Sequence, residues 1–291
     1  MPTLALATAI AAAGTDDDLH PLQDACVAAG LRADIVAWDD PTVSWARFDA
    51  VLLRSTWDYT QRLPEFLAWC ERVSALSTLL NPVEVVRWNT DKHYLGELAL
   101  KQVPVIPSHY VEPGGNAAAF PEFDEFVVKP CVGAGSRGAR RFVLAERDAA
   151  IVHATSLLAL GNSILVQPYL AAVDDIGETS LIFFDGRFSH AIRKGPLLRR
   201  GENATRALFA AEHIGARKPS DEEREVAKRV LAALPFERLA YARVDLLPSP
   251  TGPQLLELEL TEPSLFFSTA PGAAERFATV LAHRLGRAPN S

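Results

Sequence analysis

Three carboxylates near the end of the chain have the spacing of a metal-binding hairpin. If the segments on either side of Thr251 pair symmetrically as antiparallel strands, Asp245 lies opposite Glu257, and Arg243 lies opposite Glu259. Side chains alternate between the two faces of a strand, so the three carboxylates share one face. Oxygen ligands at this density suit Mg²⁺, which proteins hold through a few carboxylates and substrate phosphates. The same alternation predicts that the other face is apolar, with Val244, Leu246, Leu256, Leu258 and Leu260. The alternative to a metal site is an amphipathic hairpin whose charges face water.

A glycine-rich stretch, Gly133–Gly138, has the spacing GxGxxG. In a dinucleotide-binding fold the third glycine opens a helix. Here strand patterns stand on both sides of the glycines, over Glu125–Lys129 and Arg140–Leu144. This arrangement predicts a flexible flap whose backbone N–H groups cover nucleotide phosphates. A plain tight hairpin is the alternative.

Two lysines favour the phosphate interpretation. Lys129 ends the strand before the flap, and Lys92 is expected in the first turn of a helix from Thr90 to about Gln102, capped by Asn89 or Thr90. A cation at that end opposes the helix dipole by ~0.3–1 kcal/mol, and a bound phosphate reverses the sign. A solvated surface lysine is the alternative.

Two further segments carry polar side chains that could bind a ligand. Four cations within eight residues indicate a local anion site or a solvated basic loop: Arg193, Lys194, Arg199 and Arg200. In the first half, Arg54-Ser-Thr-Trp-Asp58 follows a predicted buried strand. Loops at the carboxyl ends of parallel strands form the ligand crevice of such sheets. Packing by Trp57 and helix capping by Asp58 are the alternative.

The composition limits the class of protein. The chain has 291 residues, enough for about two domains, and 29 Lys and Arg against 36 Asp and Glu give a net charge of −7. An acidic chain has no broad field for nucleic acid or anionic lipid, so we expect neither as a partner. Cys26, Cys70 and Cys131 form no CxxC pair, which indicates a reducing, cytoplasmic location without a disulfide framework. No apolar stretch reaches the ~18 residues of a membrane helix.

The predicted secondary structure differs between the two halves of the chain. Strand and helix patterns alternate over the first hundred residues, which predicts an α/β domain with a parallel sheet: strands Leu4–Ile10, Ala33–Trp38 and Asp49–Arg54 with helices Leu19–Ala29 and Pro64–Leu76. Short paired strands and amphipathic helices follow, which predicts an α+β second half. Asp185-Gly186 is a strong hairpin signal between two of these strands.

Other chemistries have little support. The sequence contains neither GxSxG nor HExxH, and its histidines are scattered without forming a ligand pair. Cys131 adjoins the flap but has no predicted histidine base, so a small buried thiol is expected rather than a nucleophile.

Taken together, the order of these motifs resembles the ATP-grasp carboxylate–amine ligases, in particular the bacterial glutathione synthetase branch. The resemblance covers nearly the whole chain and is carried by Lys92, Lys129, the glycine flap, Gln167-Pro-Tyr-Leu170, Gly177-Glu178, Arg193, Asp245 and Glu257-Leu-Glu259. It implies a Rossmann-like N-terminal domain over residues 1–103 and two α+β lobes, 104–170 and 171–291, that clamp ATP.

The same resemblance implies a role for each matching residue. Phosphates would be bound by Lys92, Lys129 and the flap residues Gly133, Gly135, Ser136 and Gly138. Adenine would lie at Gln167, Tyr169 and Leu170, the ribose at Glu178, and the transferred phosphoryl group at Arg193 and Lys194. Two Mg²⁺ ions would be held by Asp245, Glu257 and Glu259. Many relatives have Asn where this chain has Glu259.

A narrower resemblance is to the O-ureido-serine cyclo-ligases of cycloserine biosynthesis. It covers Ala5–Ala9, Arg54–Tyr59, Arg87–Tyr94 and Glu257–Phe267. It implies an ATP- and Mg²⁺-dependent closure of O-ureido-D-serine to D-cycloserine, with release of ADP, phosphate, CO₂ and ammonia. The substrate would be a small amino acid, its amino group held by Asp58 and its carboxylate by a polar set: Arg54, Ser55, Thr56, Thr261 and Ser264. A homodimer is a state that the sequence leaves open.

Two alternatives differ in function class. One is an ATP-grasp ligase that joins two separate molecules. The other is a nucleotide-binding regulatory protein without turnover, which the three clustered carboxylates disfavour because binding alone does not require two metal ions.

Overall fold

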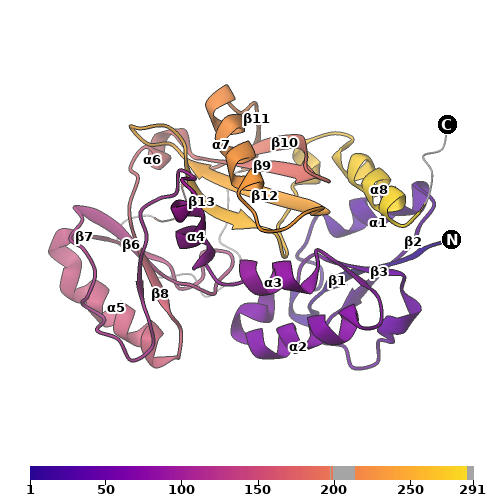
Figure 1. The fold of residues 1–291 in the computed structure, drawn as a ribbon, viewed down its shortest axis with the longest axis horizontal. Helices are drawn as coiled ribbons and strands as arrows, with labels where there is room; N and C mark the ends of the chain where they lie inside the picture. The colour runs from indigo at the N-terminus through magenta and orange to yellow at the C-terminus, as the bar shows by residue number, and fades with distance from the viewer. Residues whose placement is uncertain (197, 199–213, 287–291) are drawn as a thin grey trace.

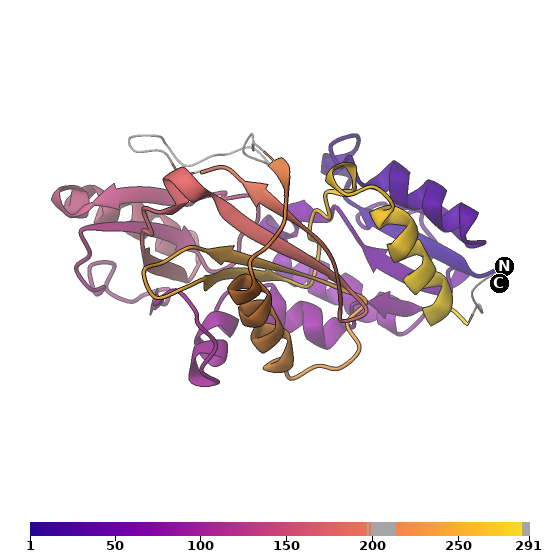
Figure 2. The ribbon, with the colours of Figure 1, turned by 90° about the horizontal axis from the view of Figure 1, so that it is seen from above.

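The structure is a computed structural model that describes residues 1–196, 198 and 214–286. Arg199 and Arg200 of the predicted basic segment lie outside these residues. Three sheets lie side by side along the long axis of the molecule (Figures 1 and 2), with the five-stranded sheet between the other two. Among the described residues, no helix is both long and apolar enough to cross a bilayer.

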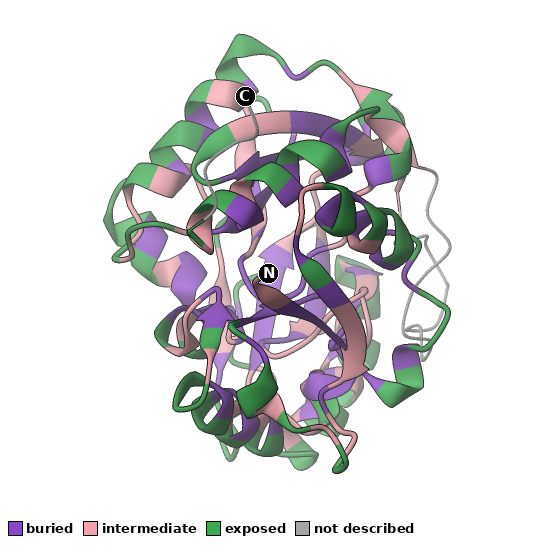
Figure 3. Ribbon diagram, turned by 90° about the vertical axis from the view of Figure 1, so that its right-hand side faces the viewer, coloured by how far each residue is buried: buried purple, intermediate pink, exposed green. Residues whose placement is uncertain are grey.

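The first sheet is parallel, as the alternating pattern predicts. Its strand order is β2-β1-β3-β4, with β1 (Thr3–Thr8), β2 (Arg32–Ala37), β3 (Ala50–Leu53) and β4 (Thr78–Leu80). Leu4 and Leu6 of β1 face α1 (Leu19–Ala28) and the last helix, α8 (Ala273–Arg284). Ala5 and Ala7 face α2 (Leu63–Ser74) in a second core. The period of two thus buries both faces, as the purple strands in Figure 3 show.

The second sheet carries the glycine flap. Its antiparallel order is β5-β8-β6-β7, with β5 (His109–Val111), β6 (Glu125–Pro130), β7 (Arg140–Val143) and β8 (Ile164–Pro168). Residues 131–139 join β6 to β7, so the predicted strand–turn–strand arrangement is confirmed. Helix α5 (Arg147–Ala159), which the sequence analysis did not predict, buries Ala150 and Ala154 against Phe126 and Val128.

The third sheet is antiparallel and has the order β11-β10-β9-β12-β13. Its elements are β9 (Glu178–Phe184), β10 (Arg187–Lys194), β11 (Ile214–Arg217), β12 (Tyr241–Leu247), β13 (Gln254–Glu259) and the covering helix α7 (Asp221–Ala232). Asp185 and Gly186 have φ of 50° and 73° and form the predicted hairpin turn between β9 and β10. Ser220 and Glu223 form a capping box at the start of α7.

The hairpin of β12 and β13 has the predicted register in the half that lies away from its turn. Asp245 pairs with Glu257, and Arg243 pairs with Glu259. A bulge follows Asp245, so Leu246 pairs with Leu255 and the alternation is interrupted. The prediction that Leu256 shares the core face was therefore wrong, because Leu256 packs instead beside Ile106 and Leu247.

The predicted helix from Thr90 to about Gln102 was wrong at its start. Helix α3 (Val83–Asn89) ends just before the predicted start at Thr90. The next helix, α4 (Tyr94–Leu100), begins four residues after Thr90. The Asn89 side chain donates to the Leu258 carbonyl and accepts from the Leu260 amide, at 2.7 Å each. Because Asn89 binds β13 instead of capping a helix, Lys92 lies in the link between the two helices rather than in a first turn.

Candidate active site

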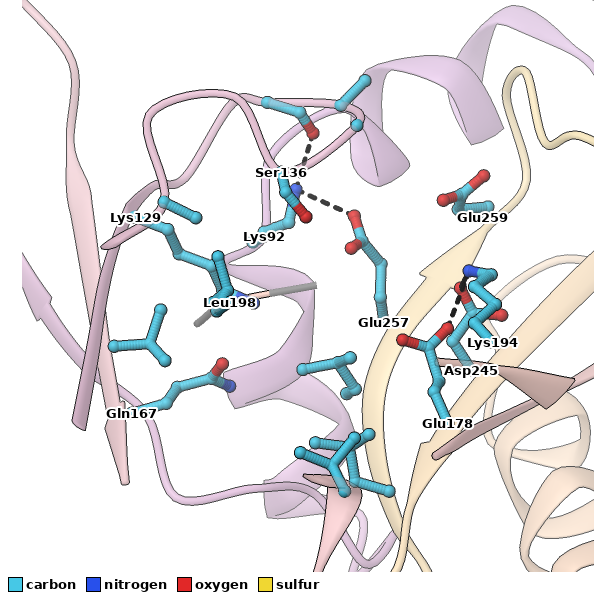
Figure 4. A pocket seen from close by; sticks show the side chains of 18 of the residues that line it. Lys92, Lys129, Ser136, Gln167, Glu178, Lys194, Leu198, Asp245, Glu257 and Glu259 are labelled. Atoms are coloured by element: carbon cyan, nitrogen blue, oxygen red, sulfur yellow. Dashed lines mark hydrogen bonds and ion pairs between the residues drawn. The ribbon is translucent and has the colours of Figure 1, made fainter. Parts of the chain in front are cut away.

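A cavity opens between the second and third sheets (Figure 4), and Trp57 from the segment after β3 also lines it. It brings together most of the candidate site residues that the sequence analysis selected. These are Lys92, Lys129, Gly133, Gly135, Ser136, Gln167, Tyr169, Leu170, Glu178, Lys194, Asp245, Glu257, Glu259 and Ser264.

Lys92 connects the flap to the acidic wall of the cavity. Its Nζ donates to the Gly133 carbonyl at 2.8 Å and lies 2.8 Å from Oε1 of Glu257. Its backbone amide donates to the Cys131 carbonyl at 3.0 Å. Burial alone would lower the pKa of Lys92, but Glu257 outweighs burial and raises it. This cation is therefore held in place before any ligand binds.

Lys129, in contrast, has no ion-pair partner within 4.0 Å among the described residues. It is the last residue but one of β6 and lies in the cavity with Lys92 and Ser136 (Figure 4). Burial lowers the pKa of Lys129 from 10.5 to about 8, only partly offset by Glu257. An anion entering this part of the cavity would supply the missing partner.

The flap has the backbone conformation that its glycines predict. Gly135, Ser136 and Gly138 have φ of 60°, 58° and 74°. Such left-handed positions cost glycine little and allow a tight turn whose amide groups point outward. A phosphate could be bound by these amides.

The opposite wall is a network of alternating charges. Lys194 Nζ lies 2.7 Å from Oε1 of Glu178 and 3.0 Å from Oδ2 of Asp245. Arg243 bridges Asp245 and Glu259, which lie on its own strand and on the neighbouring strand. Burial alone would raise the pKa of Asp245, but Arg243 and Lys194 hold it well below its usual range. The Glu259 carboxylate is thus countered by Arg243.

The carboxylates present a donor set that fits Mg²⁺. Asp245 and Glu257 are register partners on adjacent strands, and all three carboxylates line the cavity. Burial raises the pKa of Glu259, and neighbouring carboxylates add to this rise. A divalent cation would relieve that cost, and hard oxygen donors are the ligands that Mg²⁺ prefers.

The end of the cavity away from these charges is apolar. It is formed by Ile106, Val127, Val173, Leu247 and Leu256, next to Tyr169 and Leu170. The amide nitrogen of Gln167 donates to Ser108 at 2.9 Å. A flat apolar ring with a polar edge fits such a slot, and the bulge in the β12–β13 hairpin is what turns Leu256 into it.

Some predicted residues do not reach the cavity. Arg193 points away from it and donates to the carbonyls of Asp175 and Ile176, because alternation along β10 places only Lys194 on the cavity side. Asp58 accepts from Trp38 and Arg62 at 2.8 and 3.0 Å. Five further residues that were predicted to bind substrate or phosphate also lie outside the cavity lining: Arg54, Ser55, Thr56, Gly138 and Thr261.

The cavity lining also includes polar and aromatic residues that the sequence analysis did not select as site residues, among them Trp57, Arg243, Glu262 and Phe266. Arg243 could have been found, since the predicted register already placed it opposite Glu259. Glu262 had no such signal, because its position depends on contacts with segments far along the chain.

One group of possible metal ligands is formed by residues that are separated in the sequence. Donor atoms of Asp91, His93 and Cys131 all lie within 4.8 Å of one another. However, His93 is already bonded through both ring nitrogens, to Asp91 at 2.6 Å and to Glu112 at 2.9 Å. Burial raises the pKa of the Cys131 thiol to about 12. We therefore assign no metal to this group.

The fold matches solved ATP-grasp ligases. D-alanine–D-alanine ligase from Bacillus anthracis has a TM-score of 0.62 at 12% identity, covering 98% of this chain and 96% of that one. The ligase PsnB bound to a minimal precursor has a TM-score of 0.64 at 18% identity, covering 97% and 99%. At these identities the likeness shows the fold alone. Together with the closer relatives below, it defines this protein as an ATP-dependent ligase with the ATP-grasp fold.

Closer relatives give the family. Residues 4–81 match the family D-cycloserine synthetase DcsG, N-terminal domain. The cycloserine biosynthesis protein DcsG of Streptomyces lavendulae is 42% identical over 98% of this chain and 99% of that protein. The crystal structure of D-cycloserine synthetase DcsG has a TM-score of 0.91 at 41% identity, covering 97% and 99% of the two chains. The chain belongs to the D-cycloserine synthetase family.

Proposed function

We propose that this protein closes the ring of O-ureido-D-serine to form D-cycloserine, using ATP and Mg²⁺ and releasing ADP, phosphate, CO₂ and ammonia. The observation that supports this most is the cavity in which two lysines face three carboxylates beside a glycine flap, in a chain 42% identical to a cycloserine biosynthesis protein. We also propose three parts, 1–103, 104–170 and 171–291, with ATP between the second and third.

The first step activates the substrate carboxylate. A carboxylate oxygen attacks the γ-phosphorus of ATP, a P–O bond forms, and ADP leaves with the electrons of the broken bond. Lys92, Lys129 and the flap amides would bind the phosphates and stabilise their charge in the transition state. Asp245, Glu257 and Glu259 would hold Mg²⁺, which supplies further charge neutralisation when it is bound.

The second step closes the ring. The ureido nitrogen bonded to oxygen attacks the acyl carbon, a C–N bond forms, and phosphate leaves. Hydrolysis of the carbamoyl group consumes one water and gives CO₂ and ammonia. The nucleophile belongs to the same molecule, and well-oriented intramolecular reactions reach effective molarities of ~10⁵–10⁸ M. The flap would exclude water that otherwise hydrolyses the acyl phosphate.

The experiment supplies purified protein with Mg-ATP and O-ureido-D-serine, its L form or D-serine, without any added amine. We expect ADP and D-cycloserine from O-ureido-D-serine, detected by coupled assay and mass spectrometry. Turnover only when a second amino acid is added would instead support a ligase that joins two molecules. Binding of ATP without turnover of any acid would support the regulatory alternative.

A further inference from the structure

Glu262 differs from the other acidic residues of the cavity in its ion-pair partners, as far as the structure describes the chain. The other acidic residues that line the cavity each form an ion pair: Glu257 with Lys92, Glu178 with Lys194, and Asp245 and Glu259 with Arg243. Glu262 is only 6% exposed, yet no ion pair within 4.0 Å is formed by it among the described residues. A buried carboxylate without a cation is costly unless a ligand supplies one.

The surroundings of Glu262 do not remove this cost. Burial raises the pKa of its carboxyl group to about 8, and Glu259 adds to the rise. A hydrogen bond from Tyr59 and the more distant charge of Lys92 lower that pKa only in part. The site thus favours a positively charged neighbour at this carboxyl group.

The segment that carries Glu262 is fixed from several sides. Trp57 Nε1 donates to the Glu262 carbonyl at 3.1 Å, and Tyr241 donates to the Thr261 carbonyl at 2.6 Å. Asp18 accepts the amides of residues 265, 266 and 267 at 2.6, 2.9 and 2.8 Å. Phe266 within this segment has φ of 53°, a left-handed conformation that is unfavourable for a non-glycine residue and persists where surrounding contacts hold it. Glu262 is therefore held rigidly where the N-terminal domain meets the third sheet.

We propose that the Glu262 carboxylate binds the α-ammonium group of the amino-acid substrate, with Tyr59 as the residue that positions it. This assignment rests on the proposed function, since it requires an amino-acid substrate. It replaces the prediction of Asp58, whose oxygens are bound by Trp38 and Arg62. An ammonium group is the cation that a zwitterionic amino acid brings, and it can donate to Glu262 while the substrate carboxylate faces the cationic side of the cavity.

The test compares O-ureido-D-serine with 3-(ureidooxy)propanoate, the same acid without its α-amino group. In the wild type we expect kcat/KM to favour the amino acid by roughly 10- to 100-fold, the range of one charge-assisted hydrogen bond. In Glu262→Gln this preference should fall to within a few fold, with KM for ATP unchanged. Tyr59→Phe should raise KM for the amino acid alone, by a few fold.

Glu262→Asp and Glu237→Gln are the matched controls. Glu262→Asp keeps the charge and should keep most of the preference, which separates charge from packing if Glu262→Gln folds poorly. Glu237 is exposed and does not line the cavity, so Glu237→Gln should behave as wild type. A preference unchanged in Glu262→Gln, or lost equally in Glu262→Asp, would overturn the assignment.

Wild-type turnover of O-ureido-D-serine reports on the proposed function separately. If the wild type instead uses another amino acid, the same comparison is made between that acid and its deamino counterpart. A changed substrate then contradicts the proposed reaction, while the preference ratio still decides the role of Glu262.

Discussion

Lys129 and Glu262 are two buried groups of opposite charge type that line the same cavity from different sheets. Lys129 lies next to the end of β6 in the second sheet, and Glu262 follows β13 of the third sheet. Burial moves the pKa of both groups to about 8, from below for the acid and from above for the base. Neither has an ion-pair partner within 4.0 Å among the described residues. The other charged groups of the cavity described above form ion pairs within the protein, such as Lys92 with Glu257 and Lys194 with Glu178. We expect Lys129 and Glu262 to be neutralised by charges on bound ligands instead.

The largest effect should come from the paired acids. Asp245→Asn, Glu257→Gln and Glu259→Gln each remove one charge that we assign to the metal while keeping side-chain volume. For Asp245→Asn and Glu257→Gln we expect kcat to fall roughly 10²- to 10³-fold, with a much smaller change in thermal unfolding. Steady-state ADP release at limiting Mg²⁺, beside circular dichroism melts, checks this. Normal turnover of all three variants would contradict the assignment of these carboxylates to a metal ion.

Removing the unpaired base should give a smaller and more specific loss. Lys129→Met is expected to raise KM for ATP roughly 10- to 100-fold, because a charge-assisted contact to phosphate disappears. KM for the amino acid should stay within about twofold. Initial rates with each substrate varied in turn measure the two KM values separately. An equal rise in both would contradict the assignment of Lys129 to ATP and of Glu262 to the amino acid.

The pH dependence of stability sharpens the comparison further. Glu262 binds its proton more tightly when folded, with a pKa of about 8, so it costs stability as pH rises from about 4.5 through 8. Lys129 binds its proton less tightly when folded, so its cost is largest below pH 8 and vanishes as pH approaches 10.5.

Both substitutions should therefore stabilise the ligand-free protein, in opposite pH ranges. Glu262→Gln should gain roughly 1–3 kcal/mol at pH 9 and little at pH 4.5, whereas Lys129→Met should gain most near pH 6. Urea unfolding across this range, with Glu237→Gln as the control, provides the measurement. Parallel curves for the two variants would show that neither group is held against its preferred charge.

The smallest catalytic effect is expected at Glu259. Arg243 already counters this carboxylate, so Glu259→Asn should reduce kcat less than tenfold. The comparison with Glu257→Gln in the same assay isolates the difference. A loss as large as that of Glu257→Gln would place the two glutamates in the same role.

The sequence predicted the parts of this site that depend on local periodicity. Asp245 and Glu257 were placed opposite each other correctly because alternation and one turn define a hairpin register. The ATP-grasp family was identified correctly because the order of many weak motifs is specific. Local patterns also located the flap and the turn at Asp185-Gly186.

The errors arose where distant contacts override local pattern. Asn89 looks like a helix cap, but it binds β13, a strand about 170 residues further along. A bulge moved Leu256 from the core face to the cavity. Glu262 was missed because its burial depends on Trp57, which is 205 residues away in the chain. The individual roles of the site residues and the division into three parts stay predictions.

Transfer of oxygen from substrate to phosphate tests the proposed reaction most directly. O-ureido-D-serine carrying ¹⁸O in its carboxylate is incubated with the protein and Mg-ATP, and the released phosphate is analysed by mass spectrometry. Activation as an acyl phosphate predicts one ¹⁸O atom in each phosphate, with ADP and D-cycloserine formed in equal amounts. Unlabelled phosphate, or AMP and pyrophosphate in place of ADP, would contradict it.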